Sequence, residues 1–195
     1  MQRVFIVTCA VFLGLLIGCT ALWETALKRH HLSFIPPSMP VESILYVAEE
    51  AWGFGPGGNE TGIIVYAMPP SVRLSLEQSG TTWLQALPPP ANSYEWHGRY
   101  ENWYTTPTPM ARFHWVDRAT CPPDSEDRYR TLYPAGCPSV AGYMDNYGFG
   151  IPFDPEVEKI VNAALREPGS FYAFGRIGML ILIPARDLIV YVYNG

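Results

Sequence analysis

The chain has 195 residues and carries 13 basic and 18 acidic side chains, for a net charge of −5. It contains no basic stripe, which argues against nucleic-acid binding. Hydrophobic residues make up 48% of the chain, a share that suits a folded domain.

The first 23 residues are the most apolar part of the sequence. No charged side chain occurs between Val4 and Trp23, and Arg3 is the only basic residue before this run. About 20 apolar residues are long enough to cross the hydrocarbon core of a bilayer. A short basic start followed by an apolar middle is also the layout of a secretory signal. We therefore expect residues 1–23 to be a signal peptide or a transmembrane anchor that contacts membrane lipid.

Three fates of this segment fit the sequence. Residues 16–19, Leu-Ile-Gly-Cys, resemble the lipobox of bacterial lipoproteins, and that resemblance implies cleavage before Cys19 and lipidation of its thiol. An uncleaved helix would instead span the membrane once. Ordinary cleavage after Ala21 would release a soluble, secreted body.

The remaining cysteines and the flanking charges bear on the orientation of the body. Cys121 and Cys137 enclose 15 residues of a polar, proline-flanked loop. A disulfide between them would suit an oxidising compartment and stabilise the fold by about 3 kcal/mol, whereas the alternative is two free thiols. A disulfide favours a periplasmic or extracellular body in a bacterial cell envelope. Lys28 and Arg29 allow the opposite orientation, because basic residues beside a membrane segment tend to stay cytoplasmic.

Three elements are expected in the first third of the body. Residues 24–38 have little periodicity and end in two prolines, so we expect a tether. Residues 40–52 place apolar side chains at helical spacing after Pro40, which predicts a helix. Residues 62–68, Gly-Ile-Ile-Val-Tyr-Ala-Met, are short, uncharged and β-branched, which predicts a buried strand.

The next segment is ambiguous. Val72, Leu74 and Leu76 alternate as in a strand, but a proline entry, Ser71 and the closing Gly80 are typical of a capped helix. We expect a helix over residues 71–87, with a second helical piece beginning at Thr81.

Residues 88–153 form a proline- and aromatic-rich loop region that holds ten of the 19 prolines. Its best strand candidate is residues 111–116, Ala-Arg-Phe-His-Trp-Val. Long loops in a compact domain are usually functional or disordered, and the many aromatic residues argue against full disorder.

The last third has the clearest signals. Asp154, Pro155 and Glu156 form a typical helix start, and apolar residues at helical spacing extend the prediction to 166. Three strands are expected at residues 171–175, 179–183 and 188–193, the last two joined by a tight turn and therefore antiparallel. Both faces of the final strand are apolar, which predicts that it is covered on both sides.

These elements predict one α+β domain over residues 39–195. We expect a mainly antiparallel sheet of four or five strands, flanked by helices over 40–52, 71–87 and 154–166. The proline- and aromatic-rich loops are expected to lie over one side of it.

An aromatic segment at residues 94–104 is the first candidate site. It carries Trp96, Tyr100, Trp103 and Tyr104 among polar and charged side chains. Flat rings beside hydrogen-bonding groups can stack on sugar rings, so the segment is a candidate to bind an envelope glycan. The alternative is that the rings pack into the core, since aromatic side chains supply large buried areas.

A second candidate site consists of His114 and Asp117, with His97 as a third member. These residues could form a general base with its orienting acid, or a metal site. Strand positions three apart point to opposite faces, however, so convergence would require a bulge. No Gly-x-Ser-x-Gly motif is present, and the sequence gives no positive indication of a metal or cofactor.

Three classes of function follow from these observations. The leading hypothesis is a membrane-anchored envelope module that binds a glycan or protein partner, or supports structure, without catalysis. The alternative is an envelope hydrolase or metal-dependent enzyme using His97, His114 and Asp117. A further alternative is an accessory subunit of a membrane complex.

Overall fold

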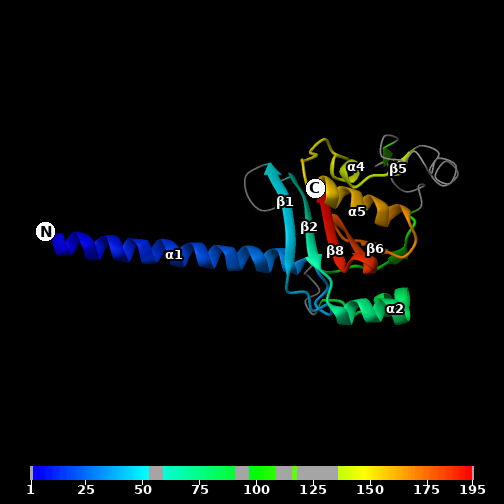
Figure 1. Ribbon diagram of the computed structural model, residues 1–195, viewed down its shortest axis with the longest axis horizontal. Coiled ribbons are helices and arrows are strands. Elements are labelled where there is room, and N and C mark those ends of the chain that lie inside the picture. Colours follow the sequence, from blue (N-terminus) through cyan, green and yellow to red (C-terminus); the bar gives the residue numbers. More distant parts are fainter. Residues whose placement is uncertain (1, 53–58, 91–96, 109–115, 118–135, 195) are drawn as a thin grey trace.

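The computed structural model describes residues 2–52, 59–90, 97–108, 116–117 and 136–194, and gives only the backbone of residues 2–17, 59, 116 and 117. It is an α+β fold in which a long helix projects from one six-stranded sheet (Figure 1). The helices are α1 (Gln2–Ser33), α2 (Pro70–Gln85), α4 (Val140–Met144) and α5 (Pro155–Arg166), with a 3-10 turn at Pro184–Arg186. The main-sheet strands are β1 (Ile44–Trp52), β2 (Asn59–Ala67), β3 (Trp103–Thr105), β6 (Phe171–Phe174), β7 (Gly178–Ile183) and β8 (Leu188–Asn194).

The main sheet has the order β1-β2-β8-β7-β6-β3, and every neighbouring pair is antiparallel. The predicted α+β class with a mainly antiparallel sheet is therefore confirmed. The predicted number of four or five strands is wrong, because β1 and β3 add an edge strand at either side.

The prediction of a helix over residues 40–52 is wrong, because Ile44–Trp52 form the strand β1. Exposure alternates along the first part of this strand, as expected for a strand with one covered face. The apolar spacing also fits a helix, and the antiparallel ladder with β2 decides between the two. That ladder joins Val47 to Ile64 and Trp52 to Asn59, and satisfies backbone groups that a helix would satisfy internally.

α1 continues well beyond the apolar segment of the sequence. Residues 24–38 were expected to be a tether, but the helix runs to Ser33, and Phe34 and Ile35 are then buried at 3% and 4% exposure. Among the residues that the structure describes, none of the helices combines the length and the apolar character that a membrane crossing needs. The end of α1 is therefore part of the folded body.

The other helices and strands follow their local signals closely. β2 and α2 occupy the predicted segments, and α2 is kinked at Gly80, where the two helical pieces were expected to meet. α5 starts after Asp154, whose carboxylate accepts a hydrogen bond from the backbone N–H of Glu156 at 2.8 Å. The three C-terminal strands and the antiparallel pairing of β7 with β8 are also confirmed.

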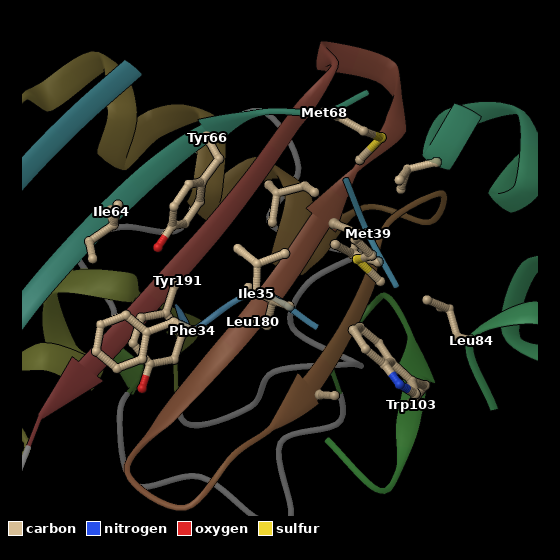
Figure 2. Close-up of a cluster of buried hydrophobic side chains, with 14 of the residues drawn as sticks. Phe34, Ile35, Met39, Ile64, Tyr66, Met68, Leu84, Trp103, Leu180 and Tyr191 are labelled. Atoms are coloured by element: carbon tan, nitrogen blue, oxygen red, sulfur yellow. The ribbon is translucent and has the colours of Figure 1, made fainter. Parts of the chain in front are cut away.

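The sheet is covered on both faces, as predicted for β8. We call one side the α2 face, where α2 and residues 34–39 pack on the sheet (Figure 2). We call the other the α5 face, where α4 and α5 pack on it. The α2-face cluster includes Phe34, Ile35, Met39, Ile64, Tyr66, Leu84, Trp103, Leu180 and Tyr191. The α5-face cluster includes Ile63, Val65, Val140, Met144, Val161, Leu165, Tyr172, Ile181 and Val192.

The region 88–153 contributes a second, two-stranded sheet of β4 (Val116–Asp117) and β5 (Cys137–Pro138). A strand over residues 111–116 was expected in the main sheet. Residues 111–115 lie outside the described part, and Val116 belongs to the smaller sheet instead. α5 supports this region through Arg166, whose Nε and Nη2 both donate to the carbonyl of Pro138, at 3.1 and 2.8 Å.

Candidate functional site

The aromatic residues predicted as a binding segment do not stay together. Tyr100 and Trp103 lie on the α2 face with ring centroids 5.7 Å apart. Tyr104 follows Trp103 in β3 and therefore points to the opposite face, where it stacks on Tyr172 at 5.4 Å. Trp96 lies outside the described residues. Only two of the four predicted side chains are thus shown to share a location.

Tyr100 and Trp103 line a pocket of about 340 Å³ where α2, β3 and the residues that follow α1 meet. Three of its lining residues are half-buried, namely Leu87, Arg99 and Tyr100. Its buried lining consists of Pro36, Pro90, Gly98 and Trp103. Its exposed lining consists of Gln85, Pro88, Pro89 and Glu101. The pocket therefore combines apolar walls with three polar side chains from two segments.

Local chemistry explains how this pocket is held. The Tyr100 hydroxyl donates to the carbonyl of Phe34 at 2.8 Å, which ties the loop to the segment after α1. Gly98 has φ +65, and a Cβ atom there would lie 2.7 Å from the carbonyl oxygen of Ile35. Only glycine adopts this conformation at such close range without strain. Residues 98–100 are consequently anchored on the core.

Arg99 is a half-buried residue of the pocket lining. Its Nε is buried, and it has no hydrogen-bond partner among the residues that the structure describes. Buried polar groups in folded proteins nearly always have such a partner. Arg99 therefore brings a guanidinium group to the pocket, and the described residues supply no acceptor for its Nε. Arg99 and Glu101 belong to the predicted aromatic segment, whereas no sequence signal indicated Gln85, because it comes from a different element.

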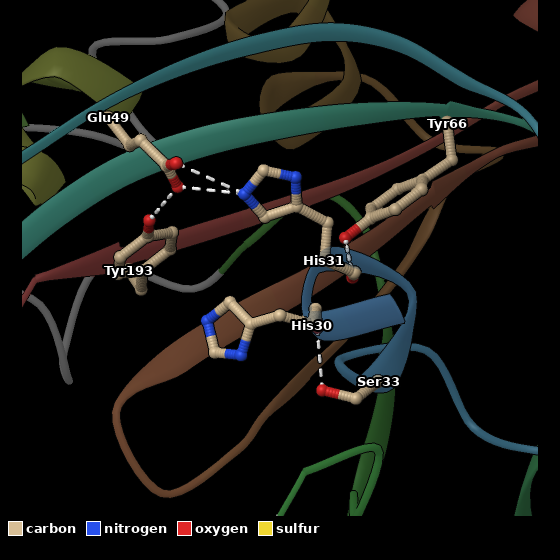
Figure 3. A network of polar contacts seen from close by, with 6 residues as sticks. All are labelled: His30, His31, Ser33, Glu49, Tyr66 and Tyr193. Carbon is tan, nitrogen blue, oxygen red and sulfur yellow. Dashed lines mark hydrogen bonds and ion pairs between the residues drawn. The ribbon is translucent and has the colours of Figure 1, made fainter. Parts of the chain in front are cut away.

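A polar network joins the end of α1 to the sheet (Figure 3). Nε2 of His31 lies 3.1 Å from both carboxylate oxygens of Glu49, and the Tyr193 hydroxyl donates to Glu49 Oε2 at 2.9 Å. The Tyr66 hydroxyl donates to the carbonyl of His31 at 2.6 Å. His31 is 4% exposed, whereas the Glu49 side chain is 35% exposed, so the network runs from the core to the surface. It connects α1 with β1, β2 and β8.

Burial has a uniform effect on the tyrosines around this network. It raises the pKa of Tyr66, Tyr100, Tyr191 and Tyr193 well above the ordinary value. For Tyr193, the charge of Glu49 and its hydrogen bond to that carboxylate raise the pKa further. These hydroxyls stay protonated, and those of Tyr66, Tyr100 and Tyr193 donate hydrogen bonds.

The side chain of Phe34 is the apolar centre of the same junction. Its ring stacks on Tyr191 with centroids 4.4 Å apart and on Tyr193 at 5.8 Å. His97 meets it edge-on at 5.0 Å, and His30 does so at 5.1 Å. Offset-stacked and edge-on pairs are the favourable arrangements of aromatic rings. The structure therefore places His97 at the α1 junction.

The candidate catalytic or metal residues are described only in part. His114 lies outside the described residues, and only the backbone of Asp117 is described, in β4. No group of three His, Cys, Asp or Glu side chains that could hold a metal ion occurs among the described residues. The rings of Phe34 and His30 both contact His97 edge-on.

The described cysteines differ in their bonding. Cys19 is an exposed, free thiol on α1. Cys137 is disulfide-bonded and fully buried in β5. Cys121 lies outside the described residues, so its pairing with Cys137 stays a prediction.

Comparison with known proteins identifies no relative. No family model, no curated protein and no solved structure matches this chain. The class that can be stated is therefore structural: an antiparallel α+β domain whose sheet is covered on both faces.

Proposed function

We propose that this protein is a membrane-anchored module of the bacterial cell envelope that binds a ligand and does not catalyse a reaction. The observation that carries the proposal is the continuity of α1. One helix runs from the uncharged segment of residues 4–23 to Ser33, and the residues directly after it are core residues. One continuous helix thus joins the apolar segment to the body.

The described end of α1 has the chemistry of a membrane–water boundary. Leu22 and Trp23 are exposed, at 73% and 71%. Lys28 and Arg29 follow on the next turns and are also exposed. Tryptophan is enriched at membrane interfaces, and basic side chains meet anionic headgroups there. This order of residues supports an anchor that ends near Trp23.

The short distance between this boundary and the body adds a geometric argument. His31, which contacts Glu49 in β1, lies eight residues after Trp23. At about 1.5 Å per residue, the helix carries the body only about 12 Å beyond the level of Trp23. The aromatic and polar contacts of Phe34 and His31 hold α1 in one orientation on the sheet. Such a joint suits a module that presents its pocket near the membrane surface.

The first test of this proposal is the intact mass of the protein extracted from membranes of a bacterium that expresses the full chain. A mass that starts at Cys19 and includes a diacylglycerol and an acyl group would support a lipid anchor. A mass that starts at Met1 would support a spanning helix. A soluble body that starts after Ala21 would overturn the anchored module.

A pair of variants separates the two anchors. Cys19→Ser should remove both the lipid and the cleavage before residue 19 from the intact mass if lipid is the anchor, and should change only the mass of the substituted residue if the helix spans the bilayer. Cys9→Ser is the matched control, because this cysteine lies in the same apolar segment but not in the resemblance to a lipobox. Thiol labelling of Cys137 before and after reduction, in the membrane-extracted protein, would show whether the body resides in an oxidising compartment.

A further inference from the structure

We infer that the 340 Å³ pocket binds one acidic sugar residue, with Arg99 on its carboxylate and Gln85 and Glu101 on its hydroxyls. This inference rests on the proposed function, since it names the ligand class of the binding module. Its evidence is the size of the pocket, the chemistry of its walls and the guanidinium group of Arg99 in its lining.

The size and the walls suit a sugar ring. Ligand pockets usually measure about 300–1,000 Å³, so this one is near the lower limit and takes a small ligand. Pro88, Pro89 and Trp103 line it with flat, apolar groups. A pyranose ring has two faces of C–H groups that pack on such surfaces, and its hydroxyls lie around the edge, where the polar side chains are.

Arg99 points to a carboxylate on that sugar. The Arg99 Nε is buried beside the pocket and has no acceptor among the described residues. A guanidinium group presents donors in a planar fork that matches the two oxygens of a carboxylate. With Arg99 in the pocket lining, a bound carboxylate would meet this fork at the pocket wall.

Glu101 and Gln85 restrict the ligand further. Both are exposed residues of the pocket lining. The carboxylate of Glu101 accepts hydrogen bonds from hydroxyls and repels a second anion, which disfavours phosphate and other multiply charged ligands. The Gln85 amide both donates and accepts, as a ring of hydroxyls requires. Together with Arg99, these groups favour a ligand with one carboxylate and several hydroxyls.

The pocket is also held in place before a ligand binds. Its buried Pro36 follows the core residues Phe34 and Ile35, and Tyr100 is fixed by its hydrogen bond to Phe34. A preorganised site loses little conformational freedom on binding. A single sugar residue can therefore bind measurably despite its small contact area.

The test is a calorimetric titration of the full-length, detergent-solubilised protein with D-glucuronate, alongside D-glucose and inorganic phosphate. We expect saturable binding of glucuronate, at least tenfold tighter than that of either other probe. Arg99→Gln should weaken glucuronate binding at least tenfold. Arg73→Gln is the matched control, because Arg73 pairs with Asp187 on the surface, does not line the pocket and should leave binding unchanged.

Gln85→Ala provides a second variant at an exposed position, where misfolding is not expected, and it should weaken glucuronate binding about threefold or more. Equal binding of glucose and glucuronate, or strong competition by phosphate, would overturn the acidic-sugar assignment. Unchanged affinity in both Arg99→Gln and Gln85→Ala would overturn the location. Absence of saturable glucuronate binding would overturn the ligand class. It would leave the anchored module standing, because the intact mass tests membrane attachment separately.

Discussion

The two faces of the sheet are covered in different ways. On the α5 face, α5 packs on the strands through a regular apolar stripe. Asp154 caps the start of this helix, and the helix ends at Arg166. On the α2 face, the cover combines a kinked helix, the irregular segment after α1 and the loop at residues 97–101. This side holds the polar network, most of the buried tyrosines and the pocket. A regular helix on a sheet stabilises the fold, whereas an irregular cover leaves room for polar groups that can serve a ligand.

The largest expected effect is a loss of the free energy of unfolding at alkaline pH, and it should come mainly from tyrosines on the α2 face. Burial raises the pKa of five described tyrosines, four on the α2 face and Tyr143 on the α5 face. Because the folded-state pKa lies above the unfolded value of 10.0, the free energy of unfolding is retained below pH 10 and falls above it. Each tyrosine should contribute a loss of about 1.4 kcal/mol per pH unit.

Urea unfolding of the solubilised chain between pH 8 and 11 measures this loss. Tyr193→Phe should make the decline shallower by the share of one tyrosine. Leu74→Ala is the control at an exposed position that carries no hydroxyl, and it should leave the slope unchanged. A free energy of unfolding that stays constant to pH 11 would contradict the prediction.

Truncating one large core residue on each face should give similar losses of stability but different effects on the pocket. Phe34→Ala should cost about 3–5 kcal/mol, because it removes the ring at 3% exposure that stacks on Tyr191. Leu165→Ala, on the α5 face, should cost about 2–5 kcal/mol. Urea unfolding measures both losses.

The same two variants should differ in the glucuronate titration. Phe34→Ala keeps the backbone carbonyl that accepts from Tyr100 but removes the ring that holds this carbonyl in place by stacking on Tyr191, so it should weaken binding. Folded Leu165→Ala should bind as the unmodified chain does. Equal binding by the two folded variants would show that the residues after α1 do not support the pocket.

A substitution at Gly98 tests the close contact of the pocket loop with the α1 segment. Gly98→Ala should lower the free energy of unfolding by about 2–3 kcal/mol, because φ +65 and the 2.7 Å approach to Ile35 both oppose a Cβ. Gly148→Ala has φ +78 but nothing within 4 Å of its Cβ, and should cost about 1 kcal/mol. Thermal unfolding compares the two, and equal losses would mean that the contact with Ile35 relaxes freely.

The smallest effect is expected at the polar network. Glu49→Gln should reduce stability by about 1–2 kcal/mol, because it removes the charge that bonds His31 and Tyr193, on a side chain 35% exposed. Glu50→Gln, at the next and exposed position of β1, should have no measurable effect. Indistinguishable unfolding curves for Glu49→Gln and the unmodified chain would show that the stacked rings alone hold α1.

Local sequence signals predicted the C-terminal third and α2 well. The capping carboxylate of Asp154, the proline at 155 and the kink at Gly80 act within a few residues, so neighbours along the chain suffice to predict them. The apolar faces of β8 likewise predicted its burial on both sides. In the aromatic segment, Tyr100 and Trp103 share one face of the sheet and Tyr104 lies on the other, so glycan binding by these residues stays a prediction.

The sequence by itself determined the α+β class, the apolar N-terminal segment and the elements whose signals are local. Only the tertiary structure decided that residues 44–52 form a strand, because their spacing fits either element and pairing with β2 satisfies their backbone. It also decided that the residues after α1 are core and that Arg99 shares a pocket with Gln85. These features depend on contacts between segments far apart in the chain, and no pattern within one segment encodes them.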